Sequence, residues 1–165
     1  MTFYRAEPSE HLLGRRATVP VANILGGGSS INFLMYTRAS ASDWDDFNTE
    51  GWRAEQLLPY MRNFENYQRP CQNPEIHGTG GEISASFGGG ITPLAHDYLR
   101  SAEALGIPFT NDLQDLKTAH GSEIWMKWID KDTGRRSDAA HGFVHNHMER
   151  NVSSCNSRGP CFWRS

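Results

Sequence analysis

Apolar side chains recur at helical spacing in the first half of the chain. Leu57, Met61 and Phe64 stand at positions i, i+4 and i+7, so they would share one face of a helix. This spacing predicts an amphipathic helix over residues 54–66, despite Pro59 near its first turns. A shorter helix is expected just before it, capped by Ser42 or Asp43, which makes residues 42–66 a mainly helical segment.

A second amphipathic helix is predicted over residues 92–105, with Gly106 as its stop and a proline two residues beyond. Its apolar positions are Leu94, Tyr98, Ala102 and Leu105. A third helix is expected over residues 137–148, where Ser137 or Asp138 can act as the cap.

Strand patterns are shorter and fewer. Polar and apolar residues alternate over 82–87, and residues 124–129 have the composition of a strand, followed by a turn at 132–134. The apolar run at 19–25 predicts a buried segment. The pattern as a whole therefore predicts an α+β fold without internal repeats.

Composition and charge exclude several classes of protein. The 165 residues carry a formal net charge of -3, which does not suit a general nucleic-acid binder, because such proteins present a basic face. The longest apolar run, about 31–36, is far shorter than the roughly 20 residues that cross a bilayer. The first residues lack the apolar core of a secretory signal. Cys71, Cys155 and Cys161 do not form a disulfide framework, so an intracellular location is expected.

The most informative segment is the glycine-rich stretch within residues 22–38. Consecutive glycines allow a ligand to approach the main chain, and successive N–H groups can bind an anion. A helix that began at Ser29 or Ser30 would also direct its positive end at a phosphate. The pattern predicts a phosphate or dinucleotide contact, and a flexible surface loop is the alternative. The residues concerned are Gly26, Gly27, Gly28, Ser29, Ser30 and Asn32.

Other polar groups are weaker candidates. The histidines at positions 141, 145 and 147 have a spacing that could chelate a metal, but a solvated helix face explains them better and no metal is predicted. Arg135 and Arg136 could hold a phosphate, although pairing with a nearby carboxylate is the preferred interpretation. The pair Asp45 and Asp46 could bind a metal, but a helix N-terminus favours acidic residues in any case, which is the preferred interpretation. Other histidines are interpreted as loop, cap or core residues: His77, His96, His120 and His141.

Several motifs occur together, in order, over residues 3–150. They are Gly14-Arg15-Arg16, Leu25-Gly26-Gly27-Gly28-Ser29-Ser30-Ile31-Asn32, Tyr36-Thr37-Arg38-Ala39, Asp43-Trp44-Asp45-Asp46-Phe47, Gly51-Trp52, Leu57-Leu58-Pro59-Tyr60, His77-Gly78, Ala104-Leu105-Gly106-Ile107-Pro108 and Thr133-Gly134-Arg135-Arg136-Ser137-Asp138-Ala139-Ala140. With them the chain resembles the glucose–methanol–choline family of flavoprotein oxidoreductases, and within that family the fungal alcohol oxidases.

The resemblance implies FAD as the cofactor. In the family this loop and the asparagine after it contact the pyrophosphate and the flavin. The positions that correspond here are Gly26, Gly27, Gly28, Ser29 and Asn32, with Phe33, Leu34 and Met35 passing near the flavin ring. The implied reaction oxidises a small primary alcohol to an aldehyde, with oxygen as the expected acceptor and a dehydrogenase acceptor as an open alternative.

Phe33 departs from the family pattern, because most relatives have glycine there. A bulky ring at this position is expected to narrow the space over the flavin. Phe33 is therefore the predicted substrate-pocket residue, and the enzyme is expected to prefer very small primary alcohols. The alternative is that Phe33 packs in the core.

The resemblance also lacks parts of the family pattern. The N-terminal Gly-x-Gly-x-x-Gly unit and the catalytic histidine have no counterpart, so no catalytic residue is assigned. The chain is therefore expected to be an internal fragment, an incomplete Rossmann-like unit. It would combine part of the FAD-binding domain of an α/β parent with part of its substrate-binding domain.

Alone, such a fragment is expected to be inactive and to fold poorly. The family region is expected to end at residue 150, and residues 151–165 to form an unrelated disordered tail. A non-catalytic remnant or interaction protein is the alternative.

The resemblance bears on partners and location as well. The parent's expected partners are the alcohol and oxygen, without nucleic acid or membrane, and a homo-oligomeric parent stays open. Small-alcohol oxidases of the family are usually peroxisomal. The last three residues, Trp163-Arg164-Ser165, do not match the peroxisomal signal, which leaves the cytoplasm as the default.

Overall fold

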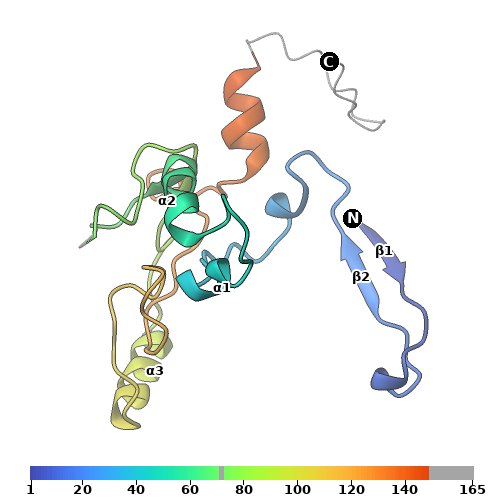
Figure 1. Ribbon diagram of the computed structural model, residues 1–165, viewed down its shortest axis with the longest axis horizontal. Coiled ribbons are helices and arrows are strands. Elements are labelled where there is room, and N and C mark those ends of the chain that lie inside the picture. Colours follow the sequence, from blue (N-terminus) through green and yellow to red (C-terminus); the bar gives the residue numbers. More distant parts are fainter. Residues whose placement is uncertain (71–72, 149–165) are drawn as a thin grey trace.

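The computed structural model describes residues 1–70 and 73–148 (Figure 1). The elements run in the order β1 (Thr2–Arg5), η1 (Glu10–Leu12), β2 (Thr18–Val21), η2 (Gly27–Ser30), α1 (Ala41–Asp45), α2 (Ala54–Phe64), β3 (Glu65–Tyr67), β4 (Ile83–Ala85), α3 (Pro93–Ala104), η3 (Ala140–Val144) and η4 (His145–His147). The expected mixture of helices and strands is confirmed. The Rossmann-like pattern and the boundary at residue 150 stay predictions, since residues 149–165 lie outside the described ranges.

The first two strands form an arm that projects from the rest of the chain (Figure 1). β1 and β2 pair antiparallel, from Thr2 opposite Val21 to Arg5 opposite Thr18. The prediction of a buried run at 19–25 is wrong, because Val19 is 48% exposed and Ile24 is 60% exposed. Apart from Thr2, every residue of the two strands is exposed, so both faces of the hairpin stay open.

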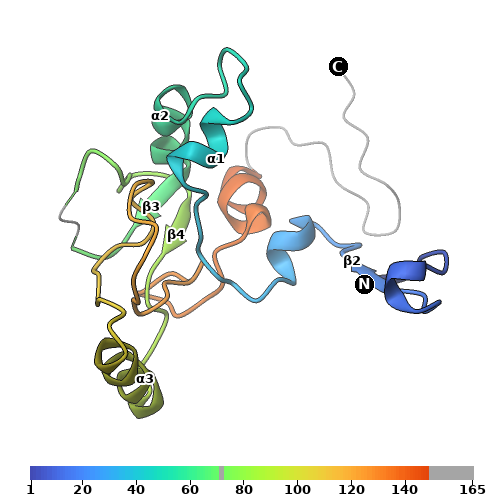
Figure 2. The same cartoon turned by 60° about the horizontal axis from the view of Figure 1, so that its bottom comes forward.

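A second pair of strands lies in the body of the molecule. α2 leads directly into β3, which pairs in parallel with β4, with Glu65 opposite Ile83 and Tyr67 opposite Ala85. Figure 2 shows these two strands side by side, with α2 beyond one end and α3 beyond the other. The predicted strand at 82–87 is thereby confirmed in its central residues.

The core is small and aromatic. Tyr36, Tyr67, Ala85 and Met126 form the buried cluster. The rings of Tyr36 and Trp128 pack edge to face with 4.7 Å between their centroids. The predicted strand at 124–129 is wrong. The segment makes only isolated bridges there, because it passes between two separate stretches of chain and continues neither ladder. The bridges join Lys127 to Met35 and Ser86, and Ile129 to Arg136.

The helix predicted at 54–66 is confirmed as α2, but the cap of the short helix before it differs from the prediction. Ser40, not Ser42 or Asp43, caps α1, since its Oγ accepts from the Asp43 backbone N at 3.4 Å while Asp43 Oδ2 accepts from Ser40 N at 2.9 Å. Asp45 Oδ1 accepts from the Ala54 backbone N at 3.0 Å, so this carboxylate caps the start of α2.

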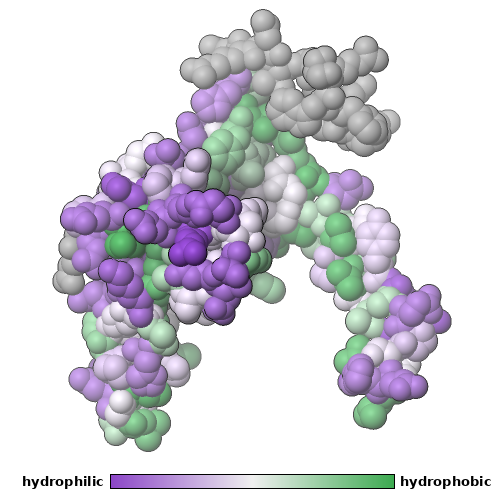
Figure 3. Space-filling view, in the orientation of Figure 1, coloured by the Kyte–Doolittle hydropathy of each residue, from purple (hydrophilic) through white to green (hydrophobic). Residues whose placement is uncertain are grey.

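α3 confirms the second predicted helix. Thr92 Oγ1 accepts from the Ala95 backbone N at 3.3 Å, and Gly106 follows the helix with φ of 83°. Most of the apolar face predicted for α3 is uncovered, because Leu94 is 75% exposed and Leu105 is 82% exposed, while Ala102 on the same face is buried. Figure 3 shows apolar surface over this end of the molecule. Among the described residues no helix is long and apolar enough to cross a bilayer.

The third predicted helix is a different kind of helix. Residues 140–144 form the π-helical turn η3, and the 3₁₀ turn η4 follows it. Asp138 Oδ1 accepts from the His141 backbone N at 2.8 Å, as expected of a capping carboxylate. A Cβ on Gly142 would lie 2.6 Å from the Ile83 side chain, so glycine allows η3 to approach β4 closely.

Candidate functional site

The glycine-rich loop lies between β2 and α1 and is shaped by its glycines. Gly26 and Gly27 have φ of 85° and 58°, which favour glycine. A Cβ on Gly26 would lie 2.3 Å from Ser30 Oγ and 3.0 Å from the Ala140 Cβ, whereas Cβ atoms on Gly27 and Gly28 would meet open space. The loop therefore has one packed side and one open side.

Two serine side chains fasten the packed side. Ser29 Oγ donates to Gly26 O at 2.6 Å and accepts from the Ala139 backbone N at 3.0 Å. Ser30 Oγ lies 3.0 Å from Leu25 O and 3.2 Å from Asp138 Oδ2. No helix begins at Ser29 or Ser30 to direct its positive end at a phosphate, because the 3₁₀ turn η2 ends at Ser30. These hydroxyls bond within the loop and to the start of η3 instead.

The guanidinium of Arg136 also holds the loop. Its Nη1 donates to Ser29 O at 2.9 Å and to Asn32 Oδ1 at 2.8 Å, and its Nη2 donates to Asn32 O at 2.8 Å. The preferred interpretation, a pairing of this arginine with a carboxylate, is wrong. Carbonyl oxygens at the end of the loop take its donors.

The three residues after Asn32 leave the loop toward the core. Leu34 has φ of 67°, its backbone N donates to Asn32 Oδ1 at 3.0 Å, and its carbonyl accepts from Trp128 N at 2.7 Å. Met35 is half exposed and bridges Lys127. Phe33 is 92% exposed, so the alternative that its ring packs in the core is wrong for this structure.

A buried polar cluster that the sequence did not assign to a site forms around Glu65. Glu65 Oε2 accepts from the Tyr36 hydroxyl at 2.7 Å and from Arg38 Nη2 at 2.6 Å. Its Oε1 lies 2.9 Å from His77 Nδ1, while His77 Nε2 lies 2.9 Å from Asp112 Oδ2. Tyr36, Arg38 and His77 all belong to recognised motifs, but the position of Glu65 after a helix carries no such signal.

Burial and charge set the protonation states in this cluster. Burial and the adjacent Glu65 raise the pKa of Tyr36 far above its usual range, so the phenol stays neutral and donates. Burial lowers the pKa of His77, but hydrogen bonds to Asp112 and Glu65 outweigh it, and the net pKa is raised above 6.5. Both ring nitrogens of His77 face carboxylate oxygens, which favours the imidazolium. The cluster thus joins four separate stretches of chain through charge-assisted hydrogen bonds.

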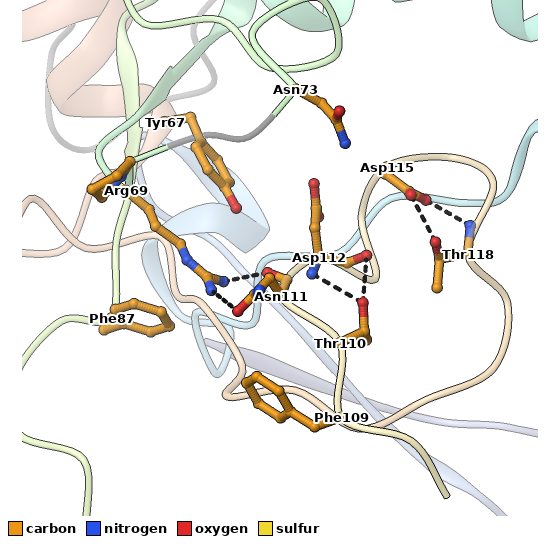
Figure 4. Close-up of a pocket in the computed structure, with 11 residues that line it drawn as sticks. Tyr67, Arg69, Asn73, Phe87, Phe109, Thr110, Asn111, Asp112, Asp115 and Thr118 are labelled. Atoms are coloured by element: carbon orange, nitrogen blue, oxygen red, sulfur yellow. Dashed lines mark hydrogen bonds between the residues drawn. The ribbon is translucent and has the colours of Figure 1, made fainter.

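A cavity of about 610 Å³ borders this cluster (Figure 4). Tyr67 and Asp112 line it, so they connect the cavity wall to the buried histidine. Arg69 extends over Phe87, with Cζ 5.1 Å from the ring centroid, and its guanidinium bonds Asn111. The charged side chains that line the cavity, Arg69, Asp112 and Asp115, all make hydrogen bonds within the chain.

Two of the histidines near residue 148, the last described residue, lie beside carboxylates. His141 Nδ1 lies 2.7 Å from Asp138 Oδ1, and His147 Nε2 lies 3.5 Å from Glu82 Oε1. Burial raises the pKa of Asp138, but hydrogen bonds from the backbone and ring of His141 outweigh it and lower the net pKa. In the ranges 1–70 and 73–148 no group of three His, Cys, Asp or Glu side chains has an arrangement that could hold a metal ion.

Comparison with known proteins identifies the family. The family model for GMC oxidoreductase matches residues 10–157. The chain belongs to the GMC oxidoreductase family. The resemblance drawn from the ordered motifs is confirmed.

Relatives that are about 60% identical to this GMC oxidoreductase chain include fungal alcohol oxidases. The alcohol oxidase of Candida boidinii is 61% identical over 147 residues, and alcohol oxidase 2 of Komagataella phaffii is 63% identical over 147 residues. Each alignment covers 89% of this chain and 22% of the relative, so the chain spans less than a quarter of the length of these relatives.

Solved structures of the family share the fold. Pyridoxine 4-oxidase from Mesorbium loti matches with a TM-score of 0.72 at 24% identity, covering 86% of this chain and 28% of that one. An FAD-dependent oxidoreductase from Chaetomium thermophilum matches with a TM-score of 0.81 at 24% identity, covering 90% of this chain and 28% of that one. The arrangement in Figures 1 and 2 is therefore a shared portion of the GMC fold.

Proposed function

We propose that this chain supplies the cofactor-contacting loop of an FAD-dependent alcohol oxidase. The enzyme oxidises a small primary alcohol to an aldehyde with oxygen as the acceptor. The observation that carries the proposal is the loop over residues 26–35, fastened on one side to η3 and open on the other. Its membership of the GMC oxidoreductases and its likeness to alcohol oxidases supply the substrate class.

The residues of the loop fit such a cofactor. Gly27 and Gly28 leave the main chain accessible on the open side, where a pyrophosphate or flavin can approach. Ser29 bonds on the packed side, so its contribution is to shape the loop. FAD, when bound, supplies the acceptor for the hydride that leaves the alcohol carbon. The chain's own residues bind and orient that group.

Phe33 is proposed to limit the size of the alcohol. Its ring is 92% exposed and follows the glycine turn directly, so it is free to line a space beside a bound flavin. Leu34 and Met35 continue the same wall, with the positive φ of Leu34 turning the backbone between them. A phenyl ring there leaves less volume than the glycine of most relatives, which supports a preference for very small alcohols.

The test transfers the matching 147 residues of this chain into Komagataella phaffii alcohol oxidase 2, which supplies the remaining parts. The expected product is a folded yellow chimaera with bound flavin that forms peroxide when methanol is added. Unmodified host enzyme is the control. A chimaera that folds by circular dichroism and gel filtration but carries no flavin would overturn the proposal.

A second arm uses the 165-residue chain itself. Titration with FAD, followed by flavin fluorescence, measures the affinity that the loop retains without the host. Flavin that co-purifies with the chain supports the cofactor module. A colourless chain together with a flavin-free chimaera would favour the non-catalytic remnant, whose uncovered apolar side chains then require another partner.

A further inference from the structure

The amide of Asn32 has only one orientation compatible with its neighbours. Arg136 Nη1 approaches Oδ1 at 2.8 Å, and the Leu34 backbone N approaches the same atom at 3.0 Å. Both neighbours are hydrogen-bond donors without acceptor capacity. Reversing the amide would place its NH₂ group against two donors, so the oxygen faces Arg136 and the nitrogen faces away.

The nitrogen of this amide is left with two N–H donors to offer. In the described part of the chain, no hydrogen bond from Asn32 Nδ2 accompanies the two that its oxygen accepts. Asn32 is exposed and stands at the end of the turn whose glycines leave their outer side open. The donors therefore stand at an exposed position beside the open side of the loop.

We infer that Arg136 is a positioning residue for the cofactor, because it fixes the Asn32 amide with its NH₂ group directed outward toward an acceptor atom of the flavin dinucleotide. This inference rests on the proposed function for the identity of the ligand. The orientation itself rests on the contacts of the described residues alone.

The shape of the arginine side chain explains why this residue type suits the position. Two terminal nitrogens of one planar fork reach Ser29 O, Asn32 O and Asn32 Oδ1 together. A lysine ammonium is a single point and cannot reproduce this fork. Arg135, the preceding residue, is exposed, and its side chain makes no hydrogen bond or ion pair within the described residues, which makes it a matched control.

The first arm of the test follows the side-chain NH₂ signals of Asn32 in ¹⁵N-labelled 165-residue chain, identified by their loss in Asn32→Asp. Arg136→Ala is expected to move these signals and the Leu34 amide signal toward their random-coil positions. Arg136→Lys should restore them in part, and Arg135→Ala should leave them in place. Unmoved signals in Arg136→Ala would overturn the inference.

The second arm uses the flavin-loaded chimaera. Asn32→Asp keeps an acceptor for Arg136 and Leu34 but removes the outward N–H donors, so the thermal midpoint of the flavin-free chimaera should stay the same. The affinity for FAD should fall about tenfold, the effect of losing one hydrogen bond. Unchanged affinity would refute the positioning role. A wild-type chimaera without flavin would refute the proposed function, while the first arm would still decide the orientation.

Discussion

Replacing Glu65 by glutamine should be among the most destabilising single changes in this chain. One carboxylate accepts from Tyr36, Arg38, His77 and the Gly78 backbone N, at distances from 2.6 to 3.3 Å. The side chains of Glu65 and Arg38 are 2% and 7% exposed, so water cannot replace these contacts. Glu65→Gln turns one acceptor oxygen into a donor that faces other donors, and it leaves the guanidinium without its counter-charge.

The magnitude follows from the cost of breaking a buried ion pair, about 3–5 kcal/mol. For a chain of this size, about 2–4 °C of the melting midpoint corresponds to each kcal/mol, so a decrease of about 6–20 °C is expected. Urea denaturation followed by tryptophan fluorescence measures the free energy of unfolding, and calorimetry measures the midpoint. Glu103→Gln is the control, because this exposed side chain on α3 makes no hydrogen bond or ion pair in the described ranges, and its change should stay within about 0.5 kcal/mol.

A loss below about 1 kcal/mol for Glu65→Gln would refute the reasoning, since it would mean that the cluster is hydrated or rearranges freely. The histidine gives a second check with a defined sign. The raised folded-state pKa of His77 adds stability that is fully present below its unfolded pKa near 6.5 and is lost as pH rises through the folded value. Glu65→Gln should weaken this loss at higher pH, because it removes one of the two carboxylates that hold the imidazolium.

Three further changes test other parts of the structure. Hydrogen bonds from Gln68, Thr133 and Ser84 outweigh burial and lower the pKa of Asp130 to about 2. Its stabilisation is present above the unfolded pKa and is lost as pH falls toward 2, so Asp130→Asn should flatten acid denaturation and the exposed Asp46→Asn should not. Gly26→Ala should open the loop to proteolysis, because the new Cβ would lie 2.3 Å from a serine oxygen, and cutting no faster than in Gly28→Ala would contradict this. Phe33→Ala in the chimaera should extend activity from methanol toward 1-butanol without changing the melting midpoint; an unchanged chain-length preference would reject the pocket assignment.

Local sequence signals were sufficient for the two longer helices, α2 and α3. The spacing of Leu57, Met61 and Phe64 predicted α2, and an apolar spacing that ends at Gly106 predicted α3, because stop signals and periodicity act over a few neighbouring residues. The same signals could not decide burial. The apolar runs in the hairpin and on α3 predict a core, yet they lie on the surface, since burial depends on which other elements come to cover them.

The candidate site divides in the same way. The glycine and serine motif could be recognised from the sequence, because glycine at backbone positions with positive φ is a local property. The family could be recognised because its motifs occur in order along the chain. The partners of that motif were not. Arg136 lies 104 positions from Asn32, and Glu65 lies 12 from His77, so no periodicity connects them.

By itself the sequence determined the family, the helices α2 and α3, and the position of the glycine-rich loop. The tertiary structure decided what holds the loop and what fills the interior. Arg136, which was expected to pair with a carboxylate, donates to backbone carbonyls instead. Glu65, which belongs to no recognised motif, is buried with four hydrogen-bond partners around its carboxylate. The physical reason is that hydrogen bonds between distant segments form only once the backbone has placed donor and acceptor within about 3 Å of each other.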